Sequence, residues 1–296
     1  RKGLELAYVT EYGLEASEQT AINFLYLFYI NPGNNSYDIF GISDERYKIA
    51  GGNQRIVEAL FQDLQQQVVL GAVLAAVTKN NADVYTLQFT GAPPASADIV
   101  VMTLPFTLLR QVDLTGLGLP SWKTGAIQNL GYGTNAKLLL GFGNRNWRNY
   151  AHSGYIFTNG STEFSEAYIQ TGWDSSQLQP VSNGSYTVFQ GGQLGAALNL
   201  SQAGTFLQQL DSIWPGTQAQ HNGIVKLIHW PSWKWSLGSY SCWRVGQVTT
   251  IKGAEYAPVG NLFFAGEHTS SVNQGYMEGG AETGSMVAKA IAVKLY

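Results

Sequence analysis

Hydrophobic residues recur every three or four positions in several segments, which is the spacing of a helix with one apolar face. The clearest case is 54–64, which follows Gly51-Gly52-Asn53. Its apolar positions Ile56, Val57, Leu60 and Leu64 fall on one side of the predicted helix. Further helices are predicted over 15–29, ended by Pro32-Gly33-Asn34-Asn35, over 202–213, ended by Pro215, and over 281–294, with Met286, Val287, Ile291 and Leu295 on the inner face.

Apolar runs between these helices predict strands at 68–78, 84–90, 98–104, 136–142, 186–189 and at the start of 261–280. From about residue 106 the chain changes character, because short strand-like runs alternate with loops rich in Gly, Asn and Ser. We therefore predict an α/β (α+β) fold of two lobes, the second of them largely antiparallel. One lobe takes 46–105 and 237–296, and the other takes 1–45 and 106–236.

Composition narrows the classes of function. The chain has 296 residues, a net charge of −3 and only 12% charged residues, so no basic surface indicates nucleic acid as a partner. The longest apolar runs are too short to cross a bilayer, so no membrane partner is predicted. Cys242 is the single cysteine, and His152, His221, His229 and His268 show no paired spacing, so no metal site is predicted. Sequons at Asn34, Asn159, Asn183 and Asn199 slightly favour a secreted or periplasmic protein.

The segment 261–280 reads as a buried strand, a Gly266-Glu267 loop, a second loop ending at Gly275, and a helix. A strand that delivers a glycine loop to a helix N-terminus is typical of a phosphate or cofactor site, because the free N–H groups favour anions. A glycine-rich dinucleotide fingerprint is absent from the sequence. The segment therefore predicts only part of a cofactor site.

Other candidate chemistry is open to two interpretations. Lys137 precedes the apolar run 138–140, and it is either a strand lysine that reaches water or a buried functional lysine. The aromatic segment 229–243 is either core or the flat wall of a pocket for a planar cofactor or an amine. His268 is interpreted as a hydrogen-bonding loop residue, not a base. No Gly-x-Ser-x-Gly motif indicates a hydrolase.

Taken together, these stretches resemble the flavin-containing amine oxidase family, which includes monoamine, polyamine and L-amino acid oxidases. The resemblance is carried by Leu262-Phe-Phe-Ala-Gly-Glu-His-Thr-Ser270 and Gly275-Tyr-Met-Glu-Gly279. Further matches are Gly51-Gly52 before a helix, Ala97-Asp98 with Leu104-Pro105, Ala136-Lys137 with Trp147 downstream, and Trp230 before Gly238-Ser239-Tyr240-Ser241. The resemblance implies a two-lobe fold that binds FAD and an oxidase that converts an amine and O2 into an imine and H2O2.

The resemblance also implies roles for single residues. Gly266, Glu267 and Gly275 would lie along FAD, with Met277 and Trp230 near its ring system and Val73 at its adenosine end. Tyr276 would form one wall of an aromatic cage for the amine, and Tyr240 or Trp243 the second. Lys137 matches the family's lysine that holds a water beside the flavin. Because Ser239 lies near the position where monoamine oxidases attach FAD to a cysteine, non-covalent FAD is expected.

Two features of the resemblance leave alternatives open. The family's N-terminal glycine-rich unit has no match here, so we expect a complete FAD site to need that segment, supplied as a second chain or missing through truncation. A homo-oligomer is the other assembly left open. The substrate is an amine or, alternatively, an L-amino acid, for which Arg145, Arg148 and Arg244 are the arginines nearest the matched motifs. A binding subunit without catalysis is the alternative from another class.

Overall fold

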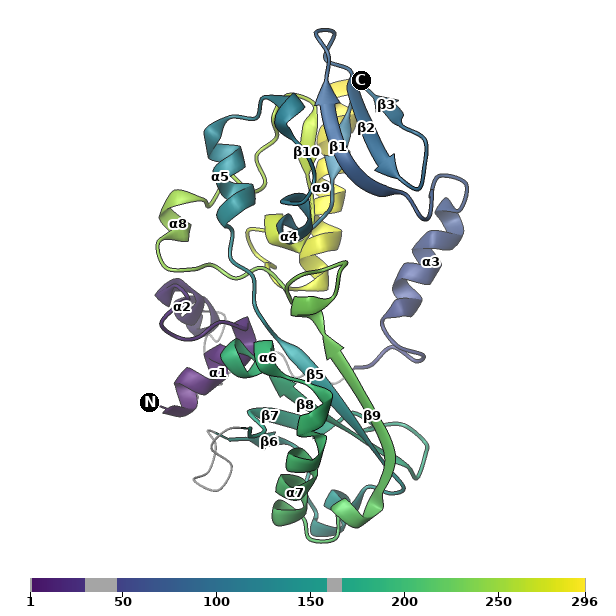
Figure 1. Cartoon of the computed structure of the whole chain (residues 1–296), viewed down its shortest axis with the longest axis vertical. Helices are drawn as coiled ribbons and strands as arrows, with labels where there is room; N and C mark the ends of the chain where they lie inside the picture. The colour runs from purple at the N-terminus through teal and green to yellow at the C-terminus, as the bar shows by residue number, and fades with distance from the viewer. Residues whose placement is uncertain (1, 30–46, 159–166, 296) are drawn as a thin grey trace.

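The computed structural model describes residues 2–29, 47–158 and 167–295. Figure 1 shows an elongated molecule in which strands β5 and β9 run from the upper part into the lower part. Its α-helices are α1 (Lys2–Tyr12), α2 (Ala21–Tyr29), α3 (Gln54–Leu64), α4 (Phe106–Leu109), α5 (Ser121–Asn129), α6 (Gly192–Ala197), α7 (Ala203–Ile213), α8 (Gln247–Thr250) and α9 (Met277–Leu295). Its strands are β1 (Val73–Lys79), β2 (Tyr85–Thr90), β3 (Ala95–Ala97), β4 (Val100–Met102), β5 (Ala136–Phe142), β6 (Ile156–Phe157), β7 (Thr171–Asp174), β8 (Gly184–Gln190), β9 (His221–His229) and β10 (Leu262–Phe264).

The upper part is built around a parallel pair of strands, β4 and β10, in which Leu262 lies opposite Val100. Every residue of β10 is buried, as its continuous apolar sequence predicts. Beside this pair lies an antiparallel sheet of order β1-β2-β3. The first core is the buried cluster that joins these strands to α4 and α5, and it includes Val77, Tyr85, Met102, Phe106, Leu109, Ile127, Leu130, Tyr132, Trp243, Leu262 and Phe264. Residues 106–132, which were predicted in the other lobe, thus contribute to this core.

The lower part is an antiparallel sheet of order β6-β7-β8-β5-β9, as the sequence predicted for this region. In β5 the residues at alternate positions are buried, so one face of the strand packs inward and the other faces away. The second core forms on the inward face and includes Leu138, Leu140, Phe142, Trp147, Tyr186, Val188, Phe206, Leu210 and Trp214. Lys137 and Leu139 therefore stand on the opposite face of the sheet.

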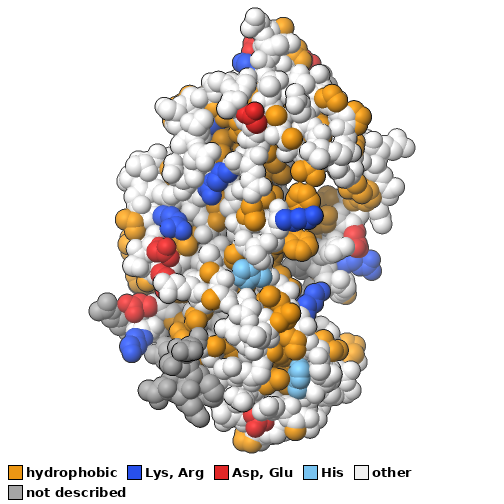
Figure 2. All heavy atoms as spheres, in the orientation of Figure 1, with side chains coloured by type: hydrophobic (Ala, Val, Ile, Leu, Met, Phe, Trp, Pro, Cys, Tyr) orange, Lys and Arg blue, Asp and Glu red, His pale blue; other side chains and the backbone are white. Residues whose placement is uncertain are grey.

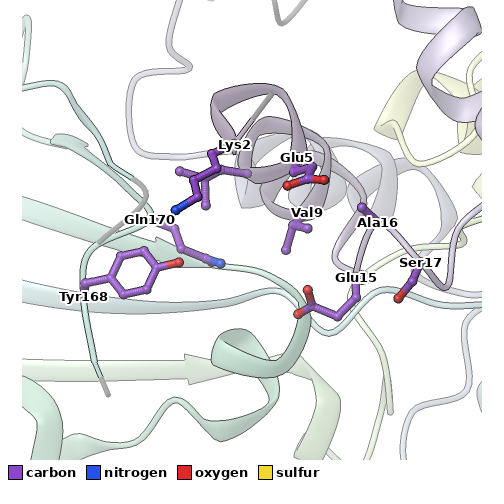
Figure 3. A pocket seen from close by; sticks show the side chains of 9 residues that line it. Lys2, Glu5, Val9, Glu15, Ala16, Ser17, Tyr168 and Gln170 are labelled. Carbon is purple, nitrogen blue, oxygen red and sulfur yellow. The ribbon is translucent and has the colours of Figure 1, made fainter. Parts of the chain in front are cut away.

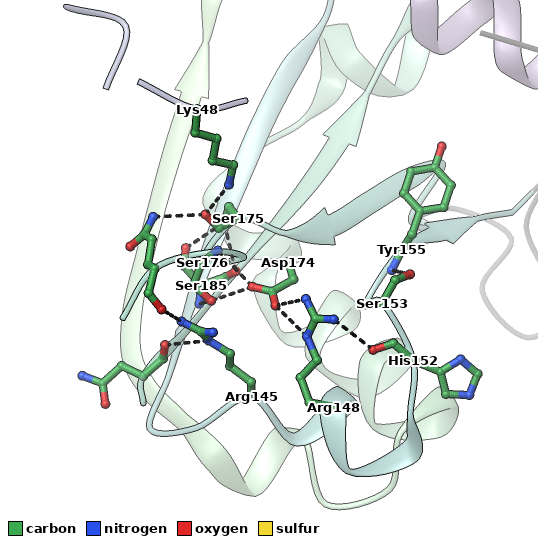
Figure 4. Close-up of polar contacts among 12 residues, drawn as sticks. Lys48, Arg145, Arg148, His152, Ser153, Tyr155, Asp174, Ser175, Ser176 and Ser185 are labelled. Atoms are coloured by element: carbon green, nitrogen blue, oxygen red, sulfur yellow. Dashed lines mark hydrogen bonds and ion pairs between the residues drawn. The ribbon is translucent and has the colours of Figure 1, made fainter. Parts of the chain in front are cut away.

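A buried carboxylate ties the end of β7 to the loop after β5 (Figure 4). Asp174 Oδ2 accepts hydrogen bonds from Arg148 Nη2 at 2.8 Å and Nε at 3.1 Å. Its Oδ1 accepts from the backbone N–H of Ser176 at 2.9 Å and from the Ser176 hydroxyl at 2.5 Å. The Asp174 side chain is fully buried, so these donors compensate the loss of water around its charge.

The helix predicted over 15–29 is wrong in its first part. Residues 13–20 form turns and an isolated bridge between Gln19 and Arg244, and the helix here, α2, begins only at Ala21. The preceding helix α1 was not predicted. Gly13 ends that segment in the left-handed region with φ of 73°, where an added Cβ would lie 2.1 Å from Asn135 Oδ1. A tertiary contact, which local periodicity does not encode, therefore separates the two helices.

Two helices expose apolar residues that the sequence pattern grouped on one face. In α3 none of the residues is buried, and Val57 and Leu60 are 62% and 61% exposed. In α9 the predicted inner face is partly wrong, because Met286 and Leu295 are exposed while Thr283 is buried. The inward stripe of α9 includes Thr283, and the helix packs most closely on the loop before it.

Two sequence predictions lie outside the described residues, namely the helix stop at 32–35 and the sequons at 34 and 159. The sequons at Asn183 and Asn199 lie at exposed positions. Within 2–29, 47–158 and 167–295, no helix combines the length and the apolar character needed to cross a membrane.

Candidate active site

The loop between β10 and α9 forms the centre of the site. Gly266 adopts φ of 140°, and an added Cβ would lie 2.6 Å from His268 Cε1, so this position requires glycine. The hydroxyl of Thr283 accepts the Gly266 N–H at 3.0 Å and fixes the loop against α9. Gly275, with φ of 85°, makes the turn that starts α9 at Met277. The N-terminus of α9 thus opens beside two glycine turns, which suits an anionic group.

The Glu267 carboxylate joins this loop to the segment 238–243. Its Oε1 accepts the Ser241 N–H at 2.9 Å, and its Oε2 accepts the Ser241 hydroxyl and the Gly275 N–H, both at 2.7 Å. Burial raises the pKa of Glu267, and the hydrogen bonds from Ser241 and Gly275 oppose that rise. The side chain therefore points at other loops of the protein.

Two tyrosines flank the glycine turn. The Tyr240 ring lies next to Gly275, whose added Cβ would be 3.6 Å from Tyr240 Cδ2. The Tyr240 hydroxyl donates to the main-chain oxygen of Glu11, and the Tyr276 hydroxyl donates to Glu11 Oε1 at 3.2 Å. Burial raises the pKa of Tyr240 well above its ordinary value, so the phenol is neutral at physiological pH. Glu11, at the end of α1, meets both hydroxyls.

Trp243, the other candidate for a second wall, has a different environment. It is buried in the first core, and its main-chain oxygen accepts the Thr20 N–H at 3.0 Å. Of the two residues that the sequence left open, Tyr240 is the one placed against the Gly275 turn. Glu11 was missed by sequence reasoning, because a single glutamate at a helix end has no local pattern that marks it.

Lys137 lies on the face of β5 that is turned away from the second core. Its Nζ is 5.3 Å from the ring centroid of Phe189, 5.4 Å from that of Trp173 and 5.6 Å from that of Trp230. Three aromatic rings around an ammonium group stabilise its positive charge without neutralising it. The structure thus brings Lys137 and Trp230 together.

Val73 lines a hollow of about 420 Å³ between β1 and the loop after β9. Figure 2 shows hydrophobic side chains gathered around a hollow near α3, with a basic side chain among them. Trp235 and Lys234 form another side of the hollow, and Lys234 Nζ lies 4.7 Å from the Trp235 ring centroid. Met277, the first residue of α9, is 57% exposed. Its sulfur accepts a hydrogen bond from Asn53 Nδ2 at 3.7 Å.

Comparison with known proteins places this arrangement in a family. The family model described as flavin containing amine oxidoreductase matches residues 10–292. The chain belongs to this family.

Individual relatives show how much of the family's length this member spans. The chain is 26% identical to polyamine oxidase 5 of Oryza sativa subsp. japonica over 80% of its own length and 49% of the relative's. It is 24% identical to the L-amino-acid oxidase of Pseudechis australis, over 86% of this chain and 50% of that one. The chain thus spans about half the length of these curated relatives.

Solved structures agree in fold. A putrescine oxidase bound to putrescine is similar with a TM-score of 0.82 and 18% identity, over 98% of this chain and 64% of that one. Cyclohexylamine oxidase from Brevibacterium oxydans IH-35A is similar with a TM-score of 0.81 and 19% identity, over 99% and 64%. The α/β fold predicted from the sequence is therefore confirmed.

The residues of this amine oxidoreductase chain fit a flavin. The glycine loop after β10 leads to the N-terminus of α9, and the backbone N–H groups at a helix N-terminus favour an anionic group. Tyr276 and Met277, at the start of α9, are 49% and 57% exposed and form a surface that a planar ring system can cover. The family is flavin-containing, and these two exposed side chains are candidates for contact with its cofactor.

A second hollow, of about 460 Å³, contains none of the predicted site residues (Figure 3). It lies between α1 and the chain before β7, with Glu5, Glu15, Tyr168 and Gln170 in its wall. Glu15 Oε1 already accepts a hydrogen bond from the Gln193 N–H at 2.8 Å.

Among the residues that the structure describes, no group of three or more His, Cys, Asp or Glu side chains is arranged to hold a metal.

His268 lies behind the glycine loop as a packing residue. Its ring is buried and packs edge-on against Phe106 at 4.6 Å between centroids. Burial, and secondarily the nearby Lys123 ammonium, lowers the pKa of His268 to about 4. Lys123, which sequence reasoning did not single out, is itself fully buried above the Phe264 ring at 3.7 Å, and burial lowers its pKa to about 7.

We expect His268 to make the protein sensitive to acid. Its pKa is about 4 in the folded chain and about 6.5 when unfolded, so the unfolded state binds the extra proton between these values. The free energy of unfolding should therefore fall by about 2–3 kcal/mol as the pH drops from 6.5 to 4. Urea unfolding across this range measures it. His268→Phe should remove this part of the loss, whereas the exposed His152→Gln should retain it; equal pH profiles for all three proteins would refute the assignment.

Proposed function

We propose that the protein is an FAD-dependent oxidase that removes two electrons and two protons from the C–N bond of an amine. Bound FAD supplies the two-electron acceptor. The overall chemistry balances, because the amine loses one hydrogen from its α-carbon and one from its nitrogen, a C=N bond forms, and O2 takes up both hydrogens as H2O2. Water then converts the imine to a carbonyl and ammonia. The observation that carries the proposal is the pair Tyr240 and Tyr276 on either side of the glycine turn that begins α9.

The chain's own residues have separate tasks in this proposal. Tyr240 and Tyr276 bind and orient the uncharged amine between aromatic faces, which favours a near-attack geometry. Neither phenol is needed as an acid or base, and the raised pKa of Tyr240 agrees with a neutral wall. Lys137, held among three rings, holds a water and offers a fixed positive charge where oxygen is reduced. Gly266, Gly275 and Met277 are proposed to contact the cofactor.

The FAD is proposed to be non-covalent. Ser239 occupies the attachment region, and its hydroxyl donates to Asn135 Oδ1 at 2.7 Å. The thiol of Cys242 is buried, its sulfur accepts from Asn23 Nδ2 at 3.4 Å, and burial raises its pKa to about 12. A buried, protonated thiol is a poor nucleophile for flavin attachment.

One experiment tests the enzyme proposal. Purified together with the segment that completes its FAD site, the protein is expected to be yellow, to release its colour on acid precipitation, and to lose its flavin band when mixed anaerobically with an amine. A yellow protein whose band no amine bleaches would support the alternative of a binding subunit without catalysis.

We further propose that a segment equivalent to the part of the relatives not spanned here completes the adenosine side of the FAD site. Three features support it: the exposed apolar residues of α3, the 39% exposure of Val73, and the hollow beside Trp235. Denaturing mass spectrometry tests this proposal. A protein that binds FAD and contains only a single species of 32.2 kDa would contradict it.

Secretion or a periplasmic location is also proposed, and the exposed sequons at Asn183 and Asn199 support it. A homo-oligomer also stays a prediction.

An amine is the proposed substrate class, with an L-amino acid as the alternative. The Glu11 carboxylate, 3.2 Å from the Tyr276 hydroxyl, places negative charge beside the cage and opposes a substrate carboxylate. The candidate arginines are bonded to other groups: Arg148 to Asp174, Arg145 to the main-chain oxygens of Gln179 and Asn183, and Arg244 to Glu18. This arrangement favours an amine.

Glu11→Gln tests this preference with little change in shape. The amide oxygen can still accept the Tyr276 hydroxyl, so only the charge is lost. Because the site is partly exposed, we expect kcat/KM for L-phenylalanine to rise about fivefold relative to phenethylamine, which differs only by lacking the carboxylate. Peroxide release with both compounds measures it. Glu5→Gln, on the same helix, serves as the matched control and should leave the ratio unchanged; an unchanged ratio in Glu11→Gln would contradict the role of this charge.

A further inference from the structure

The two tyrosine walls are held at both of their ends. At the hydroxyl ends, Tyr240 donates to the main-chain oxygen of Glu11 and Tyr276 donates to the Glu11 carboxylate. At the backbone ends, Glu267 accepts the N–H of Ser241, the residue after Tyr240, and the N–H of Gly275, the residue before Tyr276. One carboxylate thus binds the immediate backbone neighbours of both walls.

The geometry at Glu267 suits a carboxylate and no other side chain. Three donors converge on its two oxygens at 2.7–2.9 Å, namely two backbone N–H groups and the Ser241 hydroxyl. A carboxylate is acceptor-only and strengthens each of these bonds by its charge. A glutamine would turn its NH2 group toward either the Ser241 N–H or the Gly275 N–H, so one of these two backbone donors would lose its acceptor.

We propose that Glu267 is a positioning residue of the amine site, and that its carboxylate fixes the separation and tilt of the Tyr240 and Tyr276 rings. This inference rests on the proposed function, because the separation of the walls matters only when an amine binds between them. It differs from a direct contact with FAD, since the carboxylate oxygens are engaged by Ser241 and Gly275. Through these contacts, the cofactor loop and the amine cage form one connected unit.

The test compares Glu267→Gln, Glu267→Ala and the matched control Glu282→Gln. Glu282 accepts the Ser270 hydroxyl at 2.8 Å and the Asn273 amide at 3.2 Å. It therefore supports the same loop between β10 and α9 without bonding to Ser241 or Gly275. The assay uses whichever of benzylamine, hexylamine and putrescine the wild type oxidises best. We expect kcat/KM to fall about 10-fold in Glu267→Gln and about 100-fold in Glu267→Ala, with a raised KM, because small displacements of orienting groups are costly.

A second readout is independent of activity. Amide hydrogen exchange of peptides covering 238–243 and 272–278 should increase together in both Glu267 variants, while Glu282→Gln leaves 238–243 protected and kcat/KM within about threefold of the wild type. Loss of folded protein alone would lower the apparent kcat at unchanged KM and would overturn the proposal. Loss of FAD while both peptides stay protected from hydrogen exchange would also overturn the proposal. If Glu267→Ala does not fold, Glu267→Gln decides. A wild type that oxidises none of the amines refutes the proposed function, whereas exchange still reports whether Glu267 joins the two loops.

Discussion

The variant Lys137→Met should slow the oxygen-dependent half of the reaction about 100-fold while the amine-dependent half stays within about threefold of the wild type. The reason lies in the position of the ammonium group, which is fixed 5.3–5.6 Å from the centroids of Phe189, Trp173 and Trp230. Methionine fills similar space in this aromatic surrounding but carries no charge and cannot hold a water by N–H donation. Stopped-flow absorbance, with anaerobic amine in one experiment and oxygen in the next, separates the two halves.

Lys226→Met provides the matched control for Lys137→Met. Lys226 lies on the neighbouring strand β9, paired with Leu139, and it is exposed. Its loss removes the same charge from the same sheet without changing the three-ring environment. Unchanged oxygen dependence in Lys137→Met, or an equal effect in Lys226→Met, would show that the position of this lysine has no special role.

The second large effect is expected on stability, from Asp174→Asn. The asparagine would turn an NH2 group toward donors that now share a carboxylate, either Arg148 or Ser176 (Figure 4). Because the Asp174 side chain is fully buried, we expect the free energy of unfolding to fall by about 3 kcal/mol, measured by urea unfolding. Asp83→Asn is the control: its carboxylate pairs with Lys79 at 2.7 Å on the exposed side of a turn, and its loss should matter far less.

The same carboxylate predicts a pH dependence. Burial by itself raises the pKa of Asp174, but the hydrogen bonds from Ser176 and Arg148 outweigh it, so the pKa is lowered. A lowered folded pKa means that the stabilisation is complete above the ordinary pKa of an aspartate. It is lost as the pH falls through the lower folded value. An Asp174→Asn protein whose stability equals that of the wild type at neutral pH would contradict this account.

Local sequence was enough to predict the elements whose pattern is strong. The buried strand β10, the glycine loop and a following helix were all predicted within 261–280, because β10 has no polar position and Gly266 and Gly275 lie where the turns need positive φ. The helix 54–64 and the strand 136–142 were also confirmed at their predicted bounds. Prediction was weaker where apolar residues are exposed, as at Met286 and Leu295 in α9, since periodicity shows a shared face but not what covers it.

What the sequence determined by itself is therefore the family, the strand–glycine loop–helix at 261–280 and the position of Lys137 on β5, since each depends on residues adjacent in the chain. Only the tertiary structure decided that the helix predicted from residue 15 begins at Ala21, that Tyr240 and not Trp243 faces the Gly275 turn, and that Glu11 meets both tyrosine hydroxyls. It likewise showed that the Glu267 carboxylate binds Ser241 and Gly275. These contacts join residues up to 265 positions apart, and no local periodicity encodes which distant donor meets which acceptor.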